Sequence, residues 1–305
     1  MAPLPTSRSV QAGIAPKFYG RFINGRIEEF YNNSRPISWS EMGATEKQLQ
    51  NPDVWHCFAW GIATEMAKLH SITVKEGICK TNSSDPPQIL QQIEDWGNIA
   101  KGVNLTSYNN NITNPSHEID VGKLLSDWKW MRDDILFPVE SRRKTVGQKF
   151  AHDNVFTHLD CQSLNIMTSE SWGENEVRLI DFEYAGYNPR ALDIANTWLE
   201  HCDMNNLSPD YEKEFPSITQ QKFYLWRYCK ASKGFDLKLL NTSHFLEDFR
   251  KECMKFTLLS HLTWALWSVI QHKSSEIKFD FLEYAKIRLV GYQHHKMGLT
   301  YDEII

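Results

Sequence analysis

The chain has 305 residues, of which 41% are hydrophobic and 23% are charged. These values are ordinary for a globular protein and exclude a disordered, collagen-like or mainly membrane-embedded chain. The formal net charge of −5 is spread along the sequence, which argues against binding to nucleic acid through a concentrated basic surface.

Six cysteines are scattered without a CxxC pair, a pattern that favours reduced thiols over a disulfide framework or a zinc site. The first 16 residues contain no apolar stretch long enough for a signal peptide, and the longest apolar run, Phe256 to Ile270, is interrupted by His261. We therefore expect a cytoplasmic protein without a membrane span.

Two short strands are predicted first. Lys17 to Phe22 and Arg26 to Tyr31 are aromatic and β-branched runs, and Asn24-Gly25 between them is a strong signal for a tight hairpin turn. A polar linker follows, and Asn51-Pro52-Asp53 then predicts the start of a helix, because a cap residue stands before proline at the first helical position. This helix ends near His70, and one face of it is apolar: Val54, Phe58, Ile62, Met66 and Leu69.

The rest of the chain is predicted to be mostly helical with one β insert. Helices are expected from Gln88 to Lys101 and from Ile119 to Phe137, with an Asn-rich loop between them. Short β runs occupy Val155 to Phe182, and helical periodicity returns beyond Ala191 and continues to about Gly291. The β insert carries most of the unusual polar residues.

Three oxygen-bearing side chains in the β insert are candidates for chemistry. Asp160 ends a β run, Asn165 follows five residues later, and Asp181 follows the next β run. Asn165 and Asp181 are equally distant from Gly173, so a hairpin in register about that residue would set them opposite each other, with Cβ atoms about 4.5–5.5 Å apart. An amide oxygen and a carboxylate oxygen suit Mg²⁺, which takes few protein ligands and completes its shell with phosphate and water.

A base aspartate, an asparagine shortly after it and a second aspartate followed by phenylalanine are what phosphoryl transfer requires. The protein aligns a hydroxyl, holds magnesium against the phosphates and offsets developing charge. Asp160 is placed to accept the hydroxyl proton. Taken singly, these residues are better explained as turn caps and strand ends, and it is their joint spacing that favours the functional interpretation.

The same segment resembles a known family. His158 to Asn165 is similar to the kinase-like H-N-D-x-x-x-x-N pattern, with Leu159 where asparagine is usual. Ile180 to Asn196, which reads IDFEYAGYNPRALDIAN, resembles the long signature of choline and ethanolamine kinases. Further similar segments are Ile14 to Gly20, Leu69 to Ser71 and Ser260 to Tyr292.

The resemblance implies an α+β, protein-kinase-like fold with two lobes. Residues 1–36 would hold the remnant of a truncated small β lobe and the hinge, and residues 37–305 would form a large, mostly helical C-terminal lobe. The resemblance also implies ATP and Mg²⁺ as cofactors, with the adenine meeting the hinge residues Glu29, Phe30 and Tyr31.

Site roles follow from the resemblance position by position. Asp160 would be the catalytic base and Asn165 a second catalytic residue. The metal would be held by Asn165 and Asp181, with Glu183 nearby. Glu200 matches an acidic family position close to the substrate ammonium.

An aromatic pocket for the amine is expected beside these groups. Trp264 and Trp267 lie one turn apart on a predicted helix, so their indoles point to the same side. Tyr184, Phe279 and Tyr284 would complete a box in which an ammonium gains about 0.5–2 kcal/mol of cation–π attraction per good contact. Taken alone, an aromatic pair at helical spacing is more often core packing, and the resemblance is what favours the pocket.

The chain departs from the family after Glu200, where His201 to Met204 replaces further aromatic residues, and Thr197-Trp198 replaces the usual His-Phe. A less aromatic wall weakens the preference for a trimethylammonium group. Choline versus ethanolamine therefore stays open, although Cys161-Gln162 and Phe182 favour choline.

The resemblance also implies a missing beginning. Family members carry strands with a phosphate-covering loop and a lysine or arginine before the segment that matches Ile14 to Gly20, whereas this chain has only Met1 to Gln11 there. Losing such a clamp typically costs orders of magnitude in rate.

Several functions compete on the sequence alone. One is an ATP-dependent choline or ethanolamine kinase that begins phospholipid synthesis, and another is a catalytically weak pseudoenzyme or shortened isoform that binds choline or pairs with a full-length relative. A kinase of another amino alcohol or of an aminoglycoside is a third. The expected partner is a small amino alcohol, with no nucleic acid and no membrane span, and a homodimer is left open.

Overall fold

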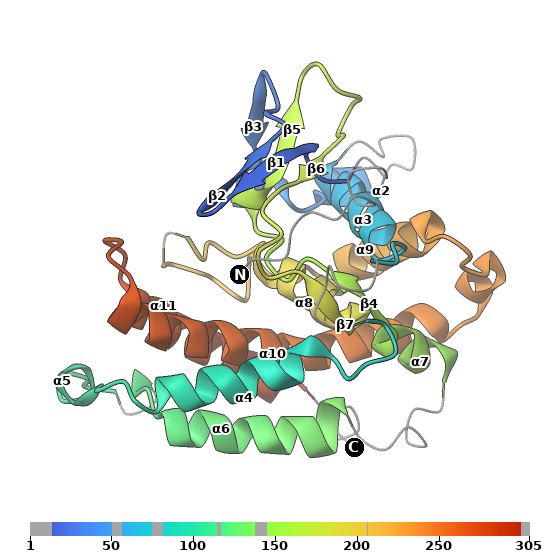
Figure 1. The fold of residues 1–305 in the computed structure, drawn as a ribbon. Helices are drawn as coiled ribbons and strands as arrows, with labels where there is room; N and C mark the ends of the chain where they lie inside the picture. The colour runs from blue at the N-terminus through green and yellow to red at the C-terminus, as the bar shows by residue number, and fades with distance from the viewer. Residues whose placement is uncertain are drawn as a thin grey trace.

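The computed structural model describes residues 14–50, 57–74, 82–114, 117–137, 145–205 and 207–299. A small strand-rich part lies above a larger helical part (Figure 1). The strands are β1 (Phe18–Phe22), β2 (Gly25–Glu28), β3 (Ser34–Pro36), β4 (Asn154–Thr157), β5 (Ile166–Ser169), β6 (Arg178–Leu179) and β7 (Gly186–Pro189).

The predicted hairpin is confirmed. Strands β1 and β2 pair antiparallel, and Phe22 pairs with Gly25 across the turn that contains Asn24. Strand β2 ends at Glu28 instead of Tyr31. The polar linker predicted over Asn32 to Pro36 instead contains strand β3, which pairs with β5, and β5 pairs with β6. The remaining ladder joins β4 to β7.

The helical part holds the segments that the periodicity predicted. Its α-helices are α2 (Glu46–Gln50), α3 (Phe58–Leu69), α4 (Gln88–Ala100), α5 (Thr106–Asn109), α6 (Val121–Trp130), α7 (Val146–His152), α8 (Arg190–Leu199), α9 (Ile218–Ala231), α10 (Phe245–Ser274) and α11 (Phe281–Gly298). Short 3₁₀ turns lie at Trp39–Glu41, Ser163–Asn165 and Leu237–Asn241.

The helix boundaries differ from the prediction in two places, and a third predicted boundary cannot be compared. The proposed start at Asn51 lies outside the described residues, while the buried side chains of Ile62, Met66 and Leu69 confirm the apolar face of α3. The helix expected to reach Phe137 changes from α6 into a π-helical turn over Met131–Leu136. The last helix continues past Gly291 to Gly298.

Helix α10 is the central element of the helical part. It has 30 residues, about 45 Å at 1.5 Å per residue, and packs against α4, α7, α8, α9 and α11. Its fully buried residues include Phe249, Phe256 and Leu259. Helix α10 thus holds α8 and α11, which carry candidate site residues, in one packed unit.

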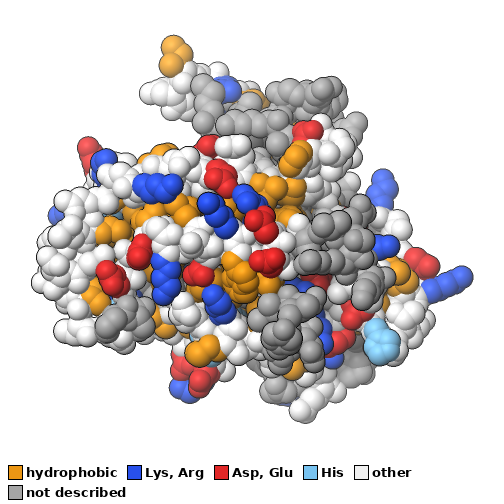
Figure 2. Space-filling view, turned by 90° about the horizontal axis from the view of Figure 1, so that it is seen from below, with side chains coloured by type: hydrophobic (Ala, Val, Ile, Leu, Met, Phe, Trp, Pro, Cys, Tyr) orange, Lys and Arg blue, Asp and Glu red, His pale blue; other side chains and the backbone are white. Residues whose placement is uncertain are grey.

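One face of the molecule carries side chains of mixed charge. On the face seen from below in Figure 1, acidic and basic side chains are interspersed among apolar ones (Figure 2). The five cysteines within the described ranges are buried and unpaired, and Cys79 lies outside those ranges. In the same ranges, every helix is too short or too polar to cross a membrane.

Buried histidines between α10 and α11 predict a pH-dependent stability. The imidazoles of His261 and His295 lie 3.2 Å apart (Nε2 to Nδ1) in the core. Burial lowers the pKa of His295 to about 4, whereas an unfolded histidine titrates near 6.5. Between these values the unfolded chain binds more protons, so the free energy of unfolding falls as the pH falls, by up to about 1.4 kcal/mol per pH unit for this group.

When the pH is lowered from 6.5 to 5, the free energy of unfolding of His295→Asn should fall by about 2 kcal/mol less than that of the wild type. Urea unfolding at the two pH values measures this difference. His272→Asn, at an exposed histidine near the end of the same α10, is the matched control and should keep the wild-type slope. Equal slopes for the wild type and His295→Asn would contradict the assignment.

Candidate active site

The loop that follows β4 is held by the first turns of α8. The carboxylate of Asp193 accepts hydrogen bonds from the backbone N–H of His158 (2.7 Å) and of Leu159 (2.8 Å), and the Asn196 amide donates to the Leu159 carbonyl (3.1 Å). Leu159 adopts the left-handed conformation, with a φ of 63°. Such a conformation costs a non-glycine residue about 1–3 kcal/mol, and these three hydrogen bonds offset that cost.

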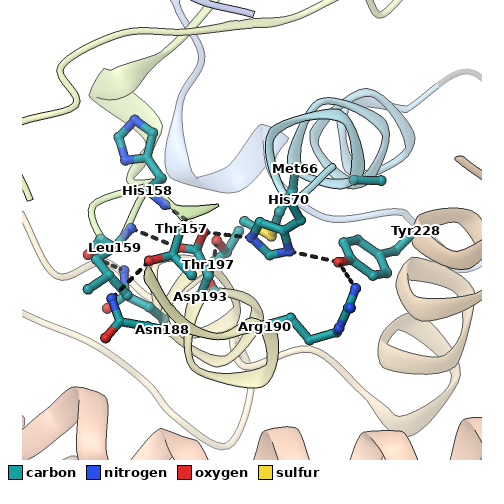
Figure 3. Close-up of polar contacts among 12 residues, drawn as sticks. Met66, His70, Thr157, His158, Leu159, Asn188, Arg190, Asp193, Thr197 and Tyr228 are labelled. Carbon is teal, nitrogen blue, oxygen red and sulfur yellow. Dashed lines mark hydrogen bonds and ion pairs between the residues drawn. The ribbon is translucent and has the colours of Figure 1, made fainter. Parts of the chain in front are cut away.

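A relay of buried side chains, formed by His70, Tyr228 and Arg190, is hydrogen-bonded to Asp193 (Figure 3). The His70 Nε2 lies 2.9 Å from Asp193 Oδ2, and its Nδ1 lies 2.7 Å from the Tyr228 hydroxyl. That hydroxyl accepts from Arg190 Nη1 (2.9 Å), so it donates to His70 Nδ1, and the neutral imidazole donates from Nε2 to Asp193.

The pKa shifts of His70 and Asp193 agree with this direction of hydrogen bonding. Burial lowers the pKa of His70 and keeps its imidazole neutral. Burial alone would raise the pKa of Asp193, but hydrogen bonds from His70 and from the His158 backbone hold it below its usual value. Asp193 is therefore an ionised carboxylate that anchors α3, α8 and the loop after β4 at one point.

Asp160 and Asn165 are brought into direct contact by this loop. The Asn165 Nδ2 donates both to the Asp160 carbonyl (2.9 Å) and to its carboxylate Oδ2 (2.8 Å). Burial raises the pKa of Asp160 well above its usual value, and the nearby carboxylates of Glu200 and Asp181 raise it further. The predicted base thus lies near two other acidic groups.

The register predicted for the β5–β6 hairpin is wrong by one residue. Ile166 pairs with Leu179, and the Ile180 N–H donates to the Asn165 carbonyl (3.0 Å), so Asn165 faces Ile180 and not Asp181. The turn is centred between Trp172 and Gly173 instead of on Gly173. Asp181 follows the end of the ladder with a φ of 60°, and this left-handed residue redirects the chain.

Asp181 and Glu183 nevertheless lie on the same side of the molecule as Asp160. Asp181 is close enough to raise the pKa of Asp160, and burial followed by Asp181 raises the pKa of Glu183. Arg26 from β2 reaches this group, with its Nη2 3.8 Å from Asp181 Oδ1.

The donor set fits the magnesium that the sequence predicts. The Asn165 Oδ1 accepts no hydrogen bond among the described contacts, because the amide uses its nitrogen toward Asp160. An amide oxygen and the Asp181 carboxylate are both hard oxygen ligands of the kind that Mg²⁺ takes, and the negative charge near Asp160 favours a cation there. Within the described residues, no three His, Cys, Asp or Glu side chains are grouped as a metal cluster.

The three predicted hinge residues lie in different surroundings. The Glu29 carboxylate accepts from the Lys17 N–H (3.1 Å), and Phe30 is 83% exposed. The Tyr31 ring packs against the Arg178 guanidinium and against Trp172, with ring centroids 5.3 Å apart for the two aromatics. Tyr31 thus ties the connection between β2 and β3 to the β5–β6 hairpin.

The five predicted aromatic residues form one continuous set of ring contacts. Trp264 and Trp267 leave the same side of α10, with ring centroids 5.4 Å apart. Tyr184 contacts Trp264 edge-on (5.2 Å) and accepts a hydrogen bond from Trp267 Nε1 (2.8 Å). Tyr284 joins the set through Trp267 at 6.4 Å and through Phe279 at 5.8 Å.

Glu200 is paired with an arginine that the sequence interpretation missed. Arg288 Nη2 donates to Glu200 Oε1 (2.6 Å) and to the Tyr284 hydroxyl, and both charged side chains are buried. The negative charge of Glu200 is therefore balanced inside the protein. Arg288 stands four residues after Tyr284 on α11, a spacing that places the two side chains on one helix face.

Asn196 is a second residue that the interpretation missed, and it joins the aromatic set to the loop after β4. Its Oδ1 accepts from Trp264 Nε1 and from the Ser260 hydroxyl (2.7 Å each), while its Nδ2 holds the Leu159 carbonyl. A small pocket opens beside this junction and is lined in part by Trp96, Tyr184, Asn196, Thr263 and Trp264.

The same fold is found in solved structures of other proteins. The chain superposes on the choline kinase from Cryptosporidium parvum with a TM-score of 0.70 and 25% identity, over 98% of this chain and 77% of that one. The architecture is the two-part, protein-kinase-like fold, with a small strand-rich part and a large helical part.

The sequence comparisons assign the family. A sequence model described as choline/ethanolamine kinase matches residues 7–293, and the chain belongs to that family of phosphotransferases. It is 30% identical to a probable ethanolamine kinase A of Dictyostelium discoideum over 92% of this chain and 68% of that protein. It is 31% identical to human ethanolamine kinase 2 over 91% of this chain and 60% of that protein. The chain thus spans between three fifths and about two thirds of the length of these relatives.

Proposed function

We propose that this protein transfers the terminal phosphoryl group of ATP to the hydroxyl of choline or ethanolamine, the first step in making the corresponding phospholipid. The observation that carries the proposal is the position of Asp160. Its carboxylate accepts a hydrogen bond from Asn165 (2.8 Å), and both Asp181 and Glu200 are close enough to raise its pKa. Metal-bound phosphate and an amino alcohol would meet at this group.

Each part of the site has a role in that reaction. Asp160 accepts the proton of the substrate hydroxyl, and Asn165 orients Asp160 through its Nδ2 while its Oδ1 is left for the metal. Asn165 and Asp181 would hold Mg²⁺, with Glu183 close by, and the bound metal would neutralise charge on the phosphates. The backbone after β2 would meet the adenine at Glu29, Phe30 and Tyr31.

The aromatic set provides a surface for a cationic substrate. Tyr184, Trp264, Trp267, Phe279 and Tyr284 contact one another through their rings, and Tyr184 and Trp264 also line the small pocket. Since Arg288 already balances Glu200, the aromatic rings supply the attraction for the ammonium.

The direct test measures phosphorylation of choline and of ethanolamine by the purified protein with ATP and Mg²⁺. Turnover with either amino alcohol, and none with an aminoglycoside, supports the proposal. The competing hypothesis of a catalytically weak binding protein predicts that calorimetry detects choline binding while no phosphorylated product forms. Absence of both binding and turnover contradicts both functions.

A substitution in the aromatic set should separate substrate binding from chemistry. Trp267→Leu removes one ring, so we expect the KM for choline to rise about 3- to 30-fold, the equivalent of one lost cation–π contact, with a smaller change in the KM for ATP. Trp267→Phe keeps a ring and is the matched control, with a KM near the wild-type value. An unchanged KM for choline in Trp267→Leu would exclude Trp267 from the amine pocket.

A further inference from the structure

The β1–β2 hairpin presents two arginines on the same face. Arg21 of β1 pairs directly with Arg26 of β2, and directly opposed residues of an antiparallel pair project to one side. Like charges in opposed positions repel each other. Glu28, two residues after Arg26, lies on the same face and its carboxylate contacts Arg26 Nε at 3.0 Å.

The side chain of Arg26 extends from this hairpin toward the carboxylates of the candidate active site. Its Nη2 lies 3.8 Å from Asp181 Oδ1, and its charge lowers the pKa of Glu183 against the opposing effects of burial and of Asp181. Among the ion pairs of the described residues, Arg26 is the basic partner of Asp181. It therefore stands where the proposed metal and phosphates would meet the strand-rich part.

The contact between Arg26 and Asp181 is weak and exchangeable. At 3.8 Å it is longer than a hydrogen bond, and the two side chains are 29% and 45% exposed. An exposed ion pair of this kind contributes about 0–1 kcal/mol. A guanidinium, by contrast, binds phosphate through two parallel N–H donors, an arrangement stronger than a distant carboxylate contact.

We propose that Arg26 is a phosphate-contacting residue, which pairs with Asp181 when the nucleotide is absent and transfers to the phosphate oxygens when a magnesium-bound nucleoside triphosphate enters. The inference rests on the nucleotide-binding part of the proposed function and names no amino alcohol. Arg26 would supply, from the β1–β2 hairpin, positive charge toward the transferred phosphoryl group.

Arg26 should therefore change the affinity for two ligands in opposite directions. A divalent cation alone must displace Arg26 from Asp181, so Arg26 weakens its binding. A nucleotide gains the guanidinium as a partner, so Arg26 strengthens its binding. Loss of the hairpin or of the whole fold would instead weaken both.

The test compares Arg26→Gln with the wild type in two binding measurements. Mn²⁺ alone, followed by electron paramagnetic resonance, should bind Arg26→Gln roughly 2- to 5-fold more tightly, because the competing cation is gone. A non-hydrolysable ATP analogue with Mg²⁺, followed by calorimetry, should bind about 10- to 100-fold more weakly, because a charge-assisted hydrogen bond is lost. Arg26→Lys keeps the charge, and its affinities for both ligands should lie between those of the wild type and of Arg26→Gln.

Arg21→Gln is the matched control, since it removes the same charge from the paired position on β1. Opposite shifts in Arg26→Gln, with smaller shifts in Arg21→Gln, support the proposal, and they do so even if neither amino alcohol is phosphorylated. Unchanged nucleotide affinity in Arg26→Gln, equal weakening of both ligands, or equal effects in the two variants would overturn it while leaving the proposed function intact. A wild-type protein that binds no nucleotide would overturn both.

Discussion

Asp160→Asn is expected to lower kcat for amino alcohol phosphorylation by about 10²- to 10⁴-fold, the usual contribution of a positioned general base. The asparagine keeps the size of the side chain and the contact with Asn165 but cannot accept the hydroxyl proton. The loss should therefore appear in kcat, with the affinity for the nucleotide close to that of the wild type. Initial rates at saturating ATP and varied choline or ethanolamine measure this directly.

Stability provides the control for this substitution. Because burial and the neighbouring carboxylates raise the pKa of Asp160, its ionised form is unfavourable in the folded protein, so that Asp160 destabilises the fold at neutral pH. Asp160→Asn should consequently unfold at the same or a higher temperature than the wild type. A variant that loses both activity and stability would mean that Asp160 is structural.

Asp193→Ala is expected to have the largest effect on the fold, a loss of about 3–5 kcal/mol in the free energy of unfolding. The substitution leaves the His158 and Leu159 amides and the His70 imidazole without their shared acceptor inside the protein. Activity should fall as well, since the loop that carries Asp160 loses its anchor. Urea unfolding followed by circular dichroism measures the loss.

Two companion variants make the result interpretable. Asp193→Asn keeps one acceptor oxygen and should lose less, which gives a folded protein for assay if the alanine variant does not fold. Asp153→Ala removes a half-exposed carboxylate at the far end of the same relay, where it pairs with Arg190 at 3.0 Å, and should cost no more than about 1 kcal/mol. Equal losses at Asp153 and Asp193 would contradict the central role of Asp193.

Local signals in the sequence were enough for much of the fold. Asn24-Gly25 predicted the first hairpin because this dipeptide favours the backbone of a tight turn, and the three- and four-residue spacing of apolar side chains predicted α3, α4 and α10. The set of aromatic residues was also named in advance, but the resemblance to the family selected it, because the one-turn spacing of Trp264 and Trp267 alone favours core packing.

Features that depend on tertiary contacts were missed. The register of β5 with β6 depends on the backbone of the turn between them, and the symmetrical count about Gly173 placed Asp181 one residue off. The partners Arg288 and Asn196 were not identified, because Glu200 and the Leu159 carbonyl, which they hold, lie far from them in the sequence. The roles assigned to Asp160, Asn165 and Asp181 remain predictions that the variants above can decide.

Two backbone conformations at the candidate active site bear on how ligands would bind. Leu159 and Asp181, next to or within the proposed catalytic set, both adopt the left-handed region that non-glycine residues usually avoid. Their energetic cost is met during folding, by the hydrogen bonds of α8 at Leu159. Substrate binding then needs little rearrangement of this segment, so more of the intrinsic affinity remains for aligning the reacting atoms, an advantage known as preorganisation.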